Sequence, residues 1–199
     1  IQRTIQNGIS YLTVSLDGLE QSHNYFRNKK DSFSKAIQAI ENVAKYNNLL
    51  FDIVTCVFPD NLDQLDKLAE LLISLNVKRW RLFTIIGKGR AARNSFLLLN
   101  ESQWHKLINW LSKNRPVLKK RGLLVEYSCE GYFKKSIDYK IRDNSYFCRA
   151  GINIASVLCD GGISGCPNIS YKLIQGNILQ DDFKSVWEDR FIPYYNRDW

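Results

Sequence analysis

Hydrophobic and polar residues alternate along positions 1 to 130 in two different rhythms. Short continuous apolar runs are typical of buried strands, and they alternate with segments whose apolar residues recur every three to four positions, as on an amphipathic helix. The predicted strands are 11–18, 49–58, 77–86 and 123–129, and the predicted helices are 31–48, 60–76 and 100–114. Such alternation indicates right-handed βαβ units, and hence an α/β fold with a parallel sheet or barrel. We expect these strands to be apolar on both faces, as in parallel sheets covered by helices.

Capping and helix-breaking residues set the expected helix ends. Asp31 or Ser32 can cap the first predicted helix, and Asn100 or Ser102 can cap the third. Pro116 lacks a backbone N–H and clashes with the preceding turn, so we expect the third helix to end before it.

The remainder of the chain is more polar and irregular. It predicts two short strands on either side of the glycine-rich turn Asp160–Gly162, which together form a β-hairpin. Gly176 indicates a further turn, and Asp182 indicates the start of a short helix. We therefore expect two domains, at residues 1–132 and 133–199.

Composition narrows the functional classes. The 199 residues carry a formal net charge of +8, but the basic residues are scattered, so we expect a solvated basic surface and no nucleic-acid partner. No apolar run approaches the roughly 20 residues that a membrane-spanning helix needs, and no signal peptide is visible. The five cysteines are an odd number and suit reduced thiols, which favours a cytoplasmic location.

The candidate chemistry lies after the strands, because ligands bind at the carboxyl ends of parallel strands. The loops at that edge are 15–18, 58–61, 87–91 and 128–131. Taken alone, the Ser-Leu-Asp-Gly loop is a weak signal, since Asp-Gly is a common turn. Cys129 and Glu130 bring a thiol and a carboxylate to the same edge, although a buried free cysteine is the more usual case.

The loop at 87–94 contains two glycines and two arginines, which suit a phosphate or carboxylate ligand, although a loop with incidental charge is the more usual case. His23 and His105 are the two histidines, and their separation gives no zinc or triad signature, so we expect both to be structural.

The cysteines of the tail pose a separate question. Cys148 precedes the predicted hairpin and Cys166 follows it, so the turn at Gly161 can bring the two thiols together. Soft thiolates suit zinc or iron–sulfur clusters. Two cysteines do not complete a four-ligand site, and a metal site, a disulfide and buried thiols all remain open on spacing alone.

These motifs together resemble the C-terminal part of a radical S-adenosylmethionine (radical SAM) enzyme that runs into a SPASM or twitch domain. The residues that carry the resemblance are 14–27, 58–72, 81–94, 147–168, 174–179 and 181–191. The order and the residue sequences of these motifs are similar to those of a subgroup of peptide-modifying radical SAM enzymes encoded near small lipoproteins.

The resemblance implies a partial (β/α)6 barrel at 1–132 and the start of a SPASM domain at 133–199. In such enzymes a [4Fe–4S] cluster and S-adenosylmethionine generate a 5′-deoxyadenosyl radical, which takes a hydrogen atom from a substrate, often a peptide or protein. Auxiliary iron–sulfur clusters occupy the SPASM domain. The cofactors carry the difficult chemistry, and the barrel positions them and excludes water.

The resemblance also assigns roles to residues of the first domain. Ser15 matches the serine that contacts the carboxylate of S-adenosylmethionine in several relatives, and Arg27 falls where relatives often carry arginine. Asn61, Gly89 and Arg90 lie on the same edge and are expected to face S-adenosylmethionine or substrate.

In the second domain, the resemblance makes Cys148 and Cys166 metal ligands of an auxiliary cluster. Cys159 falls where relatives carry an ordinary strand residue, so we expect that it is not a ligand.

The chain departs from the family in lacking the Cys-x-x-x-Cys-x-x-Cys motif. We therefore expect a truncated enzyme that is catalytically silent alone and holds at most part of an auxiliary site. Two alternatives are a non-catalytic α/β module that binds peptide or nucleic acid, and an α/β enzyme for a phosphorylated ligand with a zinc site in its tail. An incomplete barrel exposes sheet edges, which favours a homodimer; a clean monomer in light scattering would count against it.

Overall fold

The computed structural model describes residues 3, 6–47, 49–128, 131, 133–144 and 146–197. It divides into two compact units, Ile1–Tyr146 and Phe147–Trp199. The change in sequence composition falls earlier, near residue 132. Helix α6 (Lys135–Ile141) lies between these two positions and belongs to the first unit, because it packs against helix α5.

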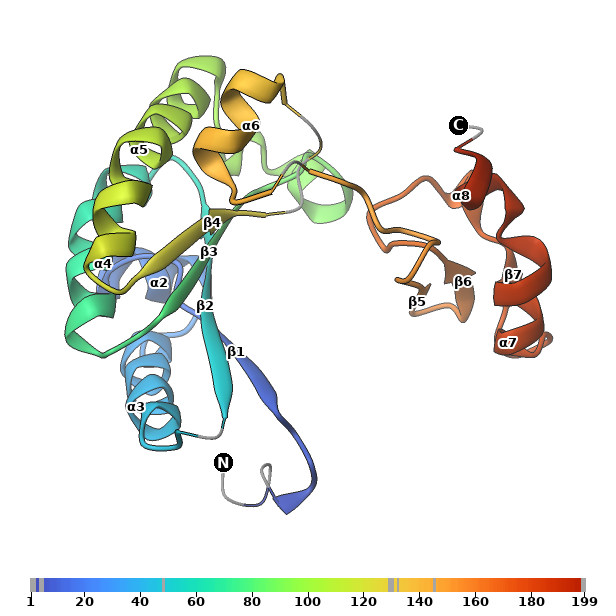
Figure 1. The fold of residues 1–199 in the computed structure, drawn as a ribbon, viewed down its shortest axis with the longest axis horizontal. Helices are drawn as coiled ribbons and strands as arrows, with labels where there is room; N and C mark the ends of the chain where they lie inside the picture. Colours follow the sequence, from blue (N-terminus) through green and yellow to red (C-terminus); the bar gives the residue numbers. More distant parts are fainter. Residues whose placement is uncertain are drawn as a thin grey trace. The chain divides into compact units, whose positions relative to one another are not determined.

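The first unit is a parallel sheet with helices between successive strands (Figure 1). Its strands, in spatial order, are β1 (Tyr11–Ser15), β2 (Leu50–Val57), β3 (Arg79–Thr84) and β4 (Leu124–Tyr127). Its helices before α6 are α2 (Glu20–Phe26), α3 (Ser32–Ala44), α4 (Leu65–Ser74) and α5 (Glu101–Lys120), with short 3₁₀ turns η1 (Leu62–Gln64), η2 (Gly89–Arg93) and η3 (Ser95–Leu97). The predicted alternation of strands and helices is confirmed. Helix α2 was not predicted, because its seven residues are too few to show a helical period.

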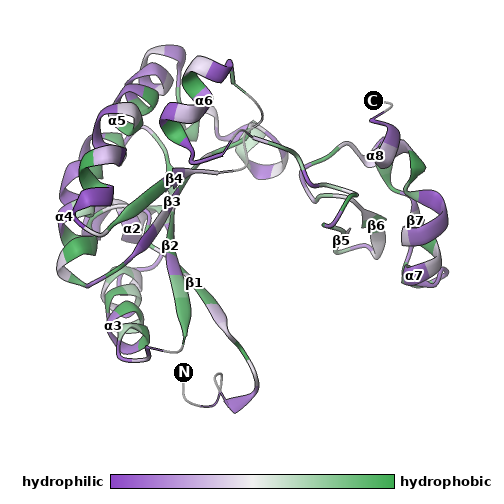
Figure 2. Cartoon of the chain, viewed as in Figure 1, coloured by the Kyte–Doolittle hydropathy of each residue, from purple (hydrophilic) through white to green (hydrophobic). Residues whose placement is uncertain are grey.

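All the long helices lie on one side of the sheet (Figure 1). Their hydrophilic residues line the outer sides of α4 and α5 (Figure 2). The expectation that the strands are apolar on both faces is wrong: the face away from these helices carries polar residues. We call it the inner face; its polar members are Tyr11, Thr13, Ser15, Asp52, Arg79, Arg81 and Glu126.

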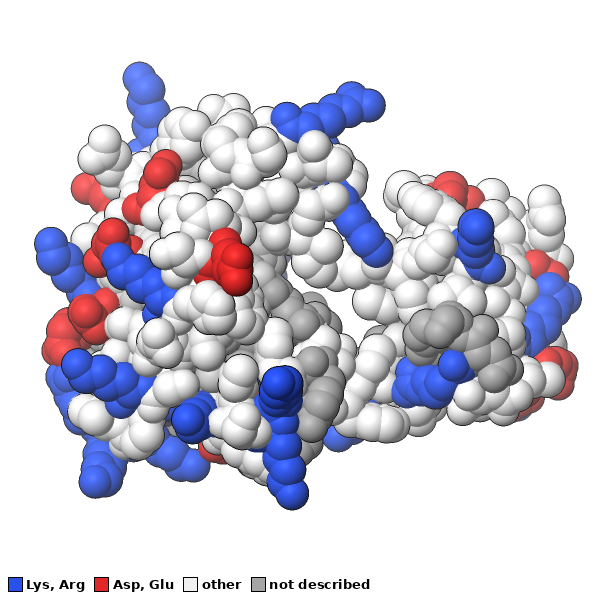
Figure 3. All heavy atoms as spheres, turned by 90° about the horizontal axis from the view of Figure 1, so that it is seen from above, with Lys and Arg blue, Asp and Glu red and all other residues white. Residues whose placement is uncertain are grey.

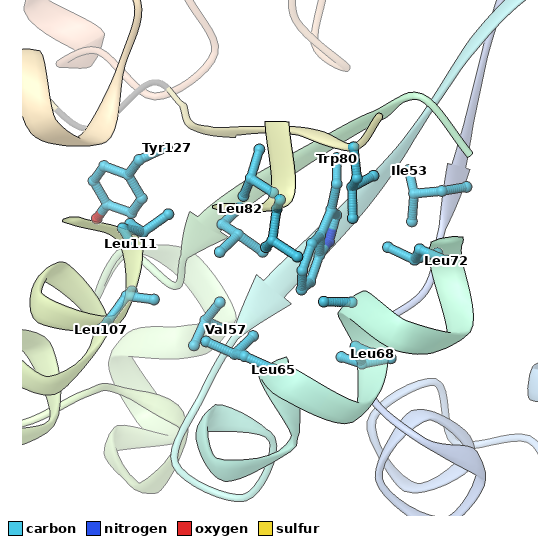
Figure 4. Packing of buried hydrophobic residues seen from close by; sticks show 14 of the residues in the cluster. Ile53, Val57, Leu65, Leu68, Leu72, Trp80, Leu82, Leu107, Leu111 and Tyr127 are labelled. Carbon is cyan, nitrogen blue, oxygen red and sulfur yellow. The ribbon is translucent and has the colours of Figure 1, made fainter. Parts of the chain in front are cut away.

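The hydrophobic core fills the space between the sheet and its helices. Trp80, on β3, is fully buried at its centre and faces leucines of α4 (Figure 4). Its indole N–H donates to the Thr55 hydroxyl at 2.8 Å, so the polar end of the ring is also satisfied.

Helix α5 begins as expected and ends later than expected. Asn100 and Gln103 form a reciprocal capping box, which confirms Asn100 as the cap. The prediction that the helix ends before Pro116 is wrong, since it continues to Lys120. Proline inside a helix costs about 3 kcal/mol. One contact on each side of Pro116 offsets that cost. Buried Arg115 donates to the Val125 carbonyl at 2.5 Å, and Leu118 packs in the core.

The second unit is built on a small antiparallel sheet. Its strands are β5 (Ser156–Val157), β6 (Gly162–Ser164) and β7 (Gly176–Asn177), and its helical segments are η4 (Tyr171–Leu173), α7 (Phe183–Ser185), η5 (Val186–Arg190, a π-helical turn) and α8 (Ile192–Asn196). The predicted hairpin is confirmed. Gly176 was expected in a turn, but it pairs with Ile163 as part of a third strand. Asp182 caps the following helix as predicted, by accepting from the Ser185 N–H at 2.9 Å.

Two surface properties follow from the described residues. No helix among them combines the length and apolar character that crossing a membrane requires. Lys and Arg side chains are spread over the visible face of each unit with acidic side chains among them, as expected for a solvated basic surface (Figure 3).

Candidate functional site

A fully buried carboxylate, Asp17, organises the carboxyl edge of the sheet. Its Oδ1 accepts from the Cys56 backbone N–H at 2.8 Å, and its Oδ2 accepts from Arg27, at 2.6 Å from Nε and 2.5 Å from Nη2. Charge-assisted bonds of this kind are stronger than neutral ones. Asp17 therefore ties the end of β1 to helix α2 and to strand β2.

His23 completes this arrangement from α2. The Asp17 backbone N–H donates to its Nδ1 at 2.9 Å, so the ring proton belongs on Nε2, which lies 3.1 Å from the Ser32 hydroxyl. Burial lowers the pKa of His23, and the nearby Asp17 carboxylate opposes this only in part. The ring is therefore a neutral structural element, in agreement with the sequence expectation.

Acid should weaken the first unit through His23. The pKa of the folded state lies below the ordinary value of 6.5, so the unfolded chain takes up the proton first, and stability falls as the pH drops below that value. The slope is at most about 1.4 kcal/mol per pH unit, the limit for one proton. Urea unfolding between about pH 8 and about pH 5.5 should show this slope in the native chain and lose it in His23→Gln. The exposed His105→Gln is the control, and an equal slope in both variants would contradict the assignment.

Asn61, like His23, uses its side chain for hydrogen bonds inside the protein. It is fully buried; its Oδ1 accepts from the Phe58 N–H at 2.9 Å, and its amide donates to the carbonyls of Asp17 and Cys56 at 2.9 and 2.8 Å. Its polar atoms are thus used to hold the loops after β1 and β2 together. The structure brings Asn61 and Arg27 to the same residue, since Asn61 donates to the Asp17 carbonyl and Arg27 to the Asp17 carboxylate.

Steric contacts explain why glycine follows Asp17 in this turn. Gly18 has φ +134°, and a Cβ there would lie 2.9 Å from the Ser22 Cβ and 3.1 Å from the Gln64 Oε1. Gln64 in turn accepts from the Leu19 N–H at 2.8 Å. Glycine is therefore required for the close approach of the two loops.

Ser15 differs from these neighbours in having an unused side chain. Val14 and Leu16 pack in the core, so Ser15 points to the inner face at the end of β1. The half-buried hydroxyl makes no hydrogen bond within the described part of the chain. It is available to a ligand at the carboxyl edge.

Gly89 and Arg90 lie in the separate turn η2, after β3. Both are exposed, and the Arg90 guanidinium makes no ion pair with any described residue. Among the described residues, neither makes a hydrogen bond or ion pair with Asp17, Arg27 or Asn61.

Of the described cysteines, Cys148, Cys159 and Cys166 have free thiols. Cys148 and Cys166 are half-buried, and the Cys166 Sγ accepts from the Asn168 N–H at 3.4 Å. Cys159 was expected in a strand, but it lies in the exposed turn between β5 and β6. Cys129, Glu130 and Tyr132 lie outside the described residues. Within the described ranges, no three His, Cys, Asp or Glu side chains gather to hold a metal ion.

Sequence reasoning missed one polar cluster, that of Asp52 and Arg81 on the inner face. Asp52 is fully buried, and its Oδ2 accepts from the Arg81 Nε. A signal was present: an aspartate interrupts the apolar run of β2, and Arg79 and Arg81 alternate with apolar residues in β3.

The chain is similar in sequence to several known proteins. No protein-family model matches the chain. Among curated proteins, an AdoMet-dependent heme synthase of Methanosarcina barkeri is 22% identical over 206 residues, covering 96% of this chain and 57% of the relative. The heme synthase of Nitratidesulfovibrio vulgaris is 22% identical over 199 residues, covering 94% and 53%. The chain thus spans about half the length of the curated relatives that it matches.

The chain is also similar in fold to solved structures. anSMEcpe with bound AdoMet superposes with a TM-score of 0.62 at 17% identity, over 95% of this chain and 53% of that one. Streptococcus suis SuiB bound to S-adenosylmethionine gives a TM-score of 0.60 at 12% identity, over 93% and 44%. The chain is related to radical SAM enzymes. Its fold, a parallel sheet followed by a small antiparallel sheet, matches these solved structures over about half of their length.

Proposed function

We propose that this chain forms part of a radical SAM enzyme that modifies a peptide or protein, and that its carboxyl edge contacts S-adenosylmethionine through Ser15. The unused Ser15 hydroxyl at the end of β1 is the observation that carries the proposal. Two solved structures of the same fold contain AdoMet, and a third is SuiB bound to its precursor peptide SuiA. S-adenosylmethionine would supply radical chemistry when reduced by an iron–sulfur cluster.

The residues of the edge divide into three groups under this proposal. Ser15 donates to the carboxylate of S-adenosylmethionine. Arg27 and Asn61 support the edge from within, since both are bonded to Asp17. Gly89 and Arg90 remain candidates for contact with S-adenosylmethionine or substrate, because their loop is exposed after β3.

The residues described here do not fit the cluster that reduces S-adenosylmethionine. The sequence has no Cys-x-x-x-Cys-x-x-Cys motif, and the described part of the chain gathers no metal-ligating triplet. We therefore propose that this chain is inactive alone, and that Cys148 and Cys166 are two ligands of an auxiliary cluster in the full-length protein. Free thiols support a cytoplasmic location, and the open strands β1 and β4 are where a second copy would pair.

Calorimetric titration with S-adenosylmethionine tests the role of Ser15. Hydrogen bonds to charged groups contribute about 1.5–3 kcal/mol, so Ser15→Ala should weaken binding by about tenfold or more. Ser102→Ala, an exposed serine on α5, is the matched control and should bind as the native chain does. Equal affinity of the two variants, or no binding by the native chain, would overturn the proposal.

Anaerobic reconstitution with iron and sulfide tests the inactivity of the isolated chain. We expect no cleavage of S-adenosylmethionine after reduction, whatever iron is retained by the second unit. Production of 5′-deoxyadenosine by this chain would show that the proposed division of cofactors is wrong.

A further inference from the structure

Two cysteine-bearing segments of the second unit meet at a pair of glycines. Gly151 lies three residues after Cys148, and Gly165 immediately precedes Cys166. Both glycines are buried. A Cβ on Gly165 would lie only 2.8 Å from the Gly151 backbone nitrogen, so a residue with a side chain would force the two backbones apart. The fold therefore depends on a close approach of the two segments beside the cysteines.

Tyr194, from helix α8, fills the space that the two glycines leave. A Cβ on Gly151 would lie 2.2 Å from the Tyr194 Cβ, and a Cβ on Gly165 would lie 2.5 Å from the Tyr194 Cε1. The tyrosine is 0% exposed and stacks on Phe191, with the ring centroids 4.9 Å apart. Because the ring lies against both segments and is itself held in the small core, it sets the distance between them.

Hydrogen bonds from the same part of the chain reach the backbone of each cysteine. The Ser164 hydroxyl lies 3.0 Å from the Tyr194 hydroxyl and 3.3 Å from the Cys166 carbonyl. Arg197, the first residue after α8, donates from Nη2 to the Cys148 carbonyl at 2.5 Å. Helix α8 and the residue that follows it thus contact both cysteine-bearing segments.

The two thiols have the properties of metal ligands. Cys148 and Cys166 are both free and half-buried. The Cys166 Sγ accepts from the Asn168 N–H at 3.4 Å, and a donor to sulfur favours the thiolate, which is the form that binds metal. Structural zinc sites and iron–sulfur clusters usually take four protein ligands, so these two thiols fit half of such a set.

We propose that Tyr194 and Arg197 are positioning residues for one metal centre that the two cysteines share. The Tyr194 ring sets the separation of the segments, and Arg197 anchors the segment that carries Cys148. This inference rests on the proposed role of Cys148 and Cys166 as ligands and deepens it, because it names the residues that act through them.

Titration of the full, reduced chain with Co²⁺ tests the inference, since thiolate ligation gives cobalt a charge-transfer absorption in the near ultraviolet. The native chain should show a saturable absorption that Cys148→Ser and Cys166→Ser lose and Cys159→Ser keeps. Tyr194→Leu should weaken cobalt binding about ten- to hundredfold, as is typical when the support of a metal ligand is removed. Tyr194→Phe keeps the ring and should recover most of the affinity. Tyr171→Leu, at a side chain that is 74% exposed, is the control and should bind as the native chain does.

A second pair of variants decides the matter if circular dichroism shows that Tyr194→Leu does not fold. Arg197→Met loses the bond to the Cys148 carbonyl and should weaken cobalt binding about tenfold. Arg149→Met removes an exposed arginine beside the same cysteine and should leave the affinity unchanged. Equal weakening in both variants would show that the effect is one of net charge, and would overturn the role of Arg197.

A merely structural role of Tyr194 gives a different result. Tyr194→Leu would then unfold at a lower urea concentration but bind cobalt with native affinity and a native spectrum while folded, and this outcome overturns the inference. Native affinity in Arg197→Met also contradicts it. Absence of the thiolate absorption in the native chain would refute the ligand role of the two cysteines and this inference with it. A native absorption that the variants leave unchanged would refute the positioning role alone.

Discussion

Replacing Trp80 with alanine should lower the free energy of unfolding of the first unit by about 3–5 kcal/mol. The ring is 0% exposed at the centre of the core, between β3 and α4 (Figure 4). Truncation removes a large apolar surface and leaves a cavity that the surrounding helices close only in part. It also leaves the Thr55 hydroxyl without its indole partner. Urea unfolding followed by circular dichroism measures the loss.

Two comparisons separate these effects of Trp80. Trp80→Phe keeps much of the apolar contact and loses the hydrogen bond, so it should cost less than Trp80→Ala. Tyr25→Ala, at a side chain that is 62% exposed on α2, should change stability by less than about 0.5 kcal/mol. A loss in Trp80→Ala no larger than that of Tyr25→Ala would refute the central position of this ring.

The predictable part of the fold is the part that local pattern decides. The strands and long helices of the first unit follow from hydrophobic periodicity, and the Asn100 cap follows from local hydrogen bonding. The prediction that α5 ends before Pro116 was wrong because the contacts that stabilise the helix there involve groups distant in sequence. These are the Val125 carbonyl and the core around Leu118. Gly176 was misjudged for a similar reason: only its partner Ile163 turns a glycine into a strand residue.

The site was predictable to a different extent. Position after a strand and the family resemblance selected Ser15, Arg27 and Asn61, but neither could show that Arg27 and Asn61 both bind Asp17. That convergence depends on the packing of α2 and the loop after β2 around one residue, whose carboxylate binds Arg27 and whose backbone carbonyl binds Asn61. Asp52 was missed because apolar neighbours masked it within a strand that was expected to be covered on both faces.

Replacing Asp17 with alanine should have the largest effect on the carboxyl edge, with a loss of about 3 kcal/mol in the free energy of unfolding of the first unit. The Cys56 N–H would lose its acceptor, and the Arg27 guanidinium would lose its counterion. Arg27 is 37% exposed and can turn to water, so the loss stays below that of a fully buried pair. Urea unfolding measures it, with the exposed Asp60→Ala as control.

A second variant of this residue, Asp17→Asn, links stability to ligand binding. Asp17 lies two residues after Ser15, and its bonds fix the direction in which the chain leaves β1. Asp17→Asn keeps an oxygen for the Cys56 N–H but loses the charge that holds Arg27, so it should destabilise less than alanine, by about 1–2 kcal/mol. If Asp17 sets the position of Ser15, Asp17→Asn should weaken S-adenosylmethionine binding while the chain remains folded. Native affinity in folded Asp17→Asn would show that β1 alone positions the serine.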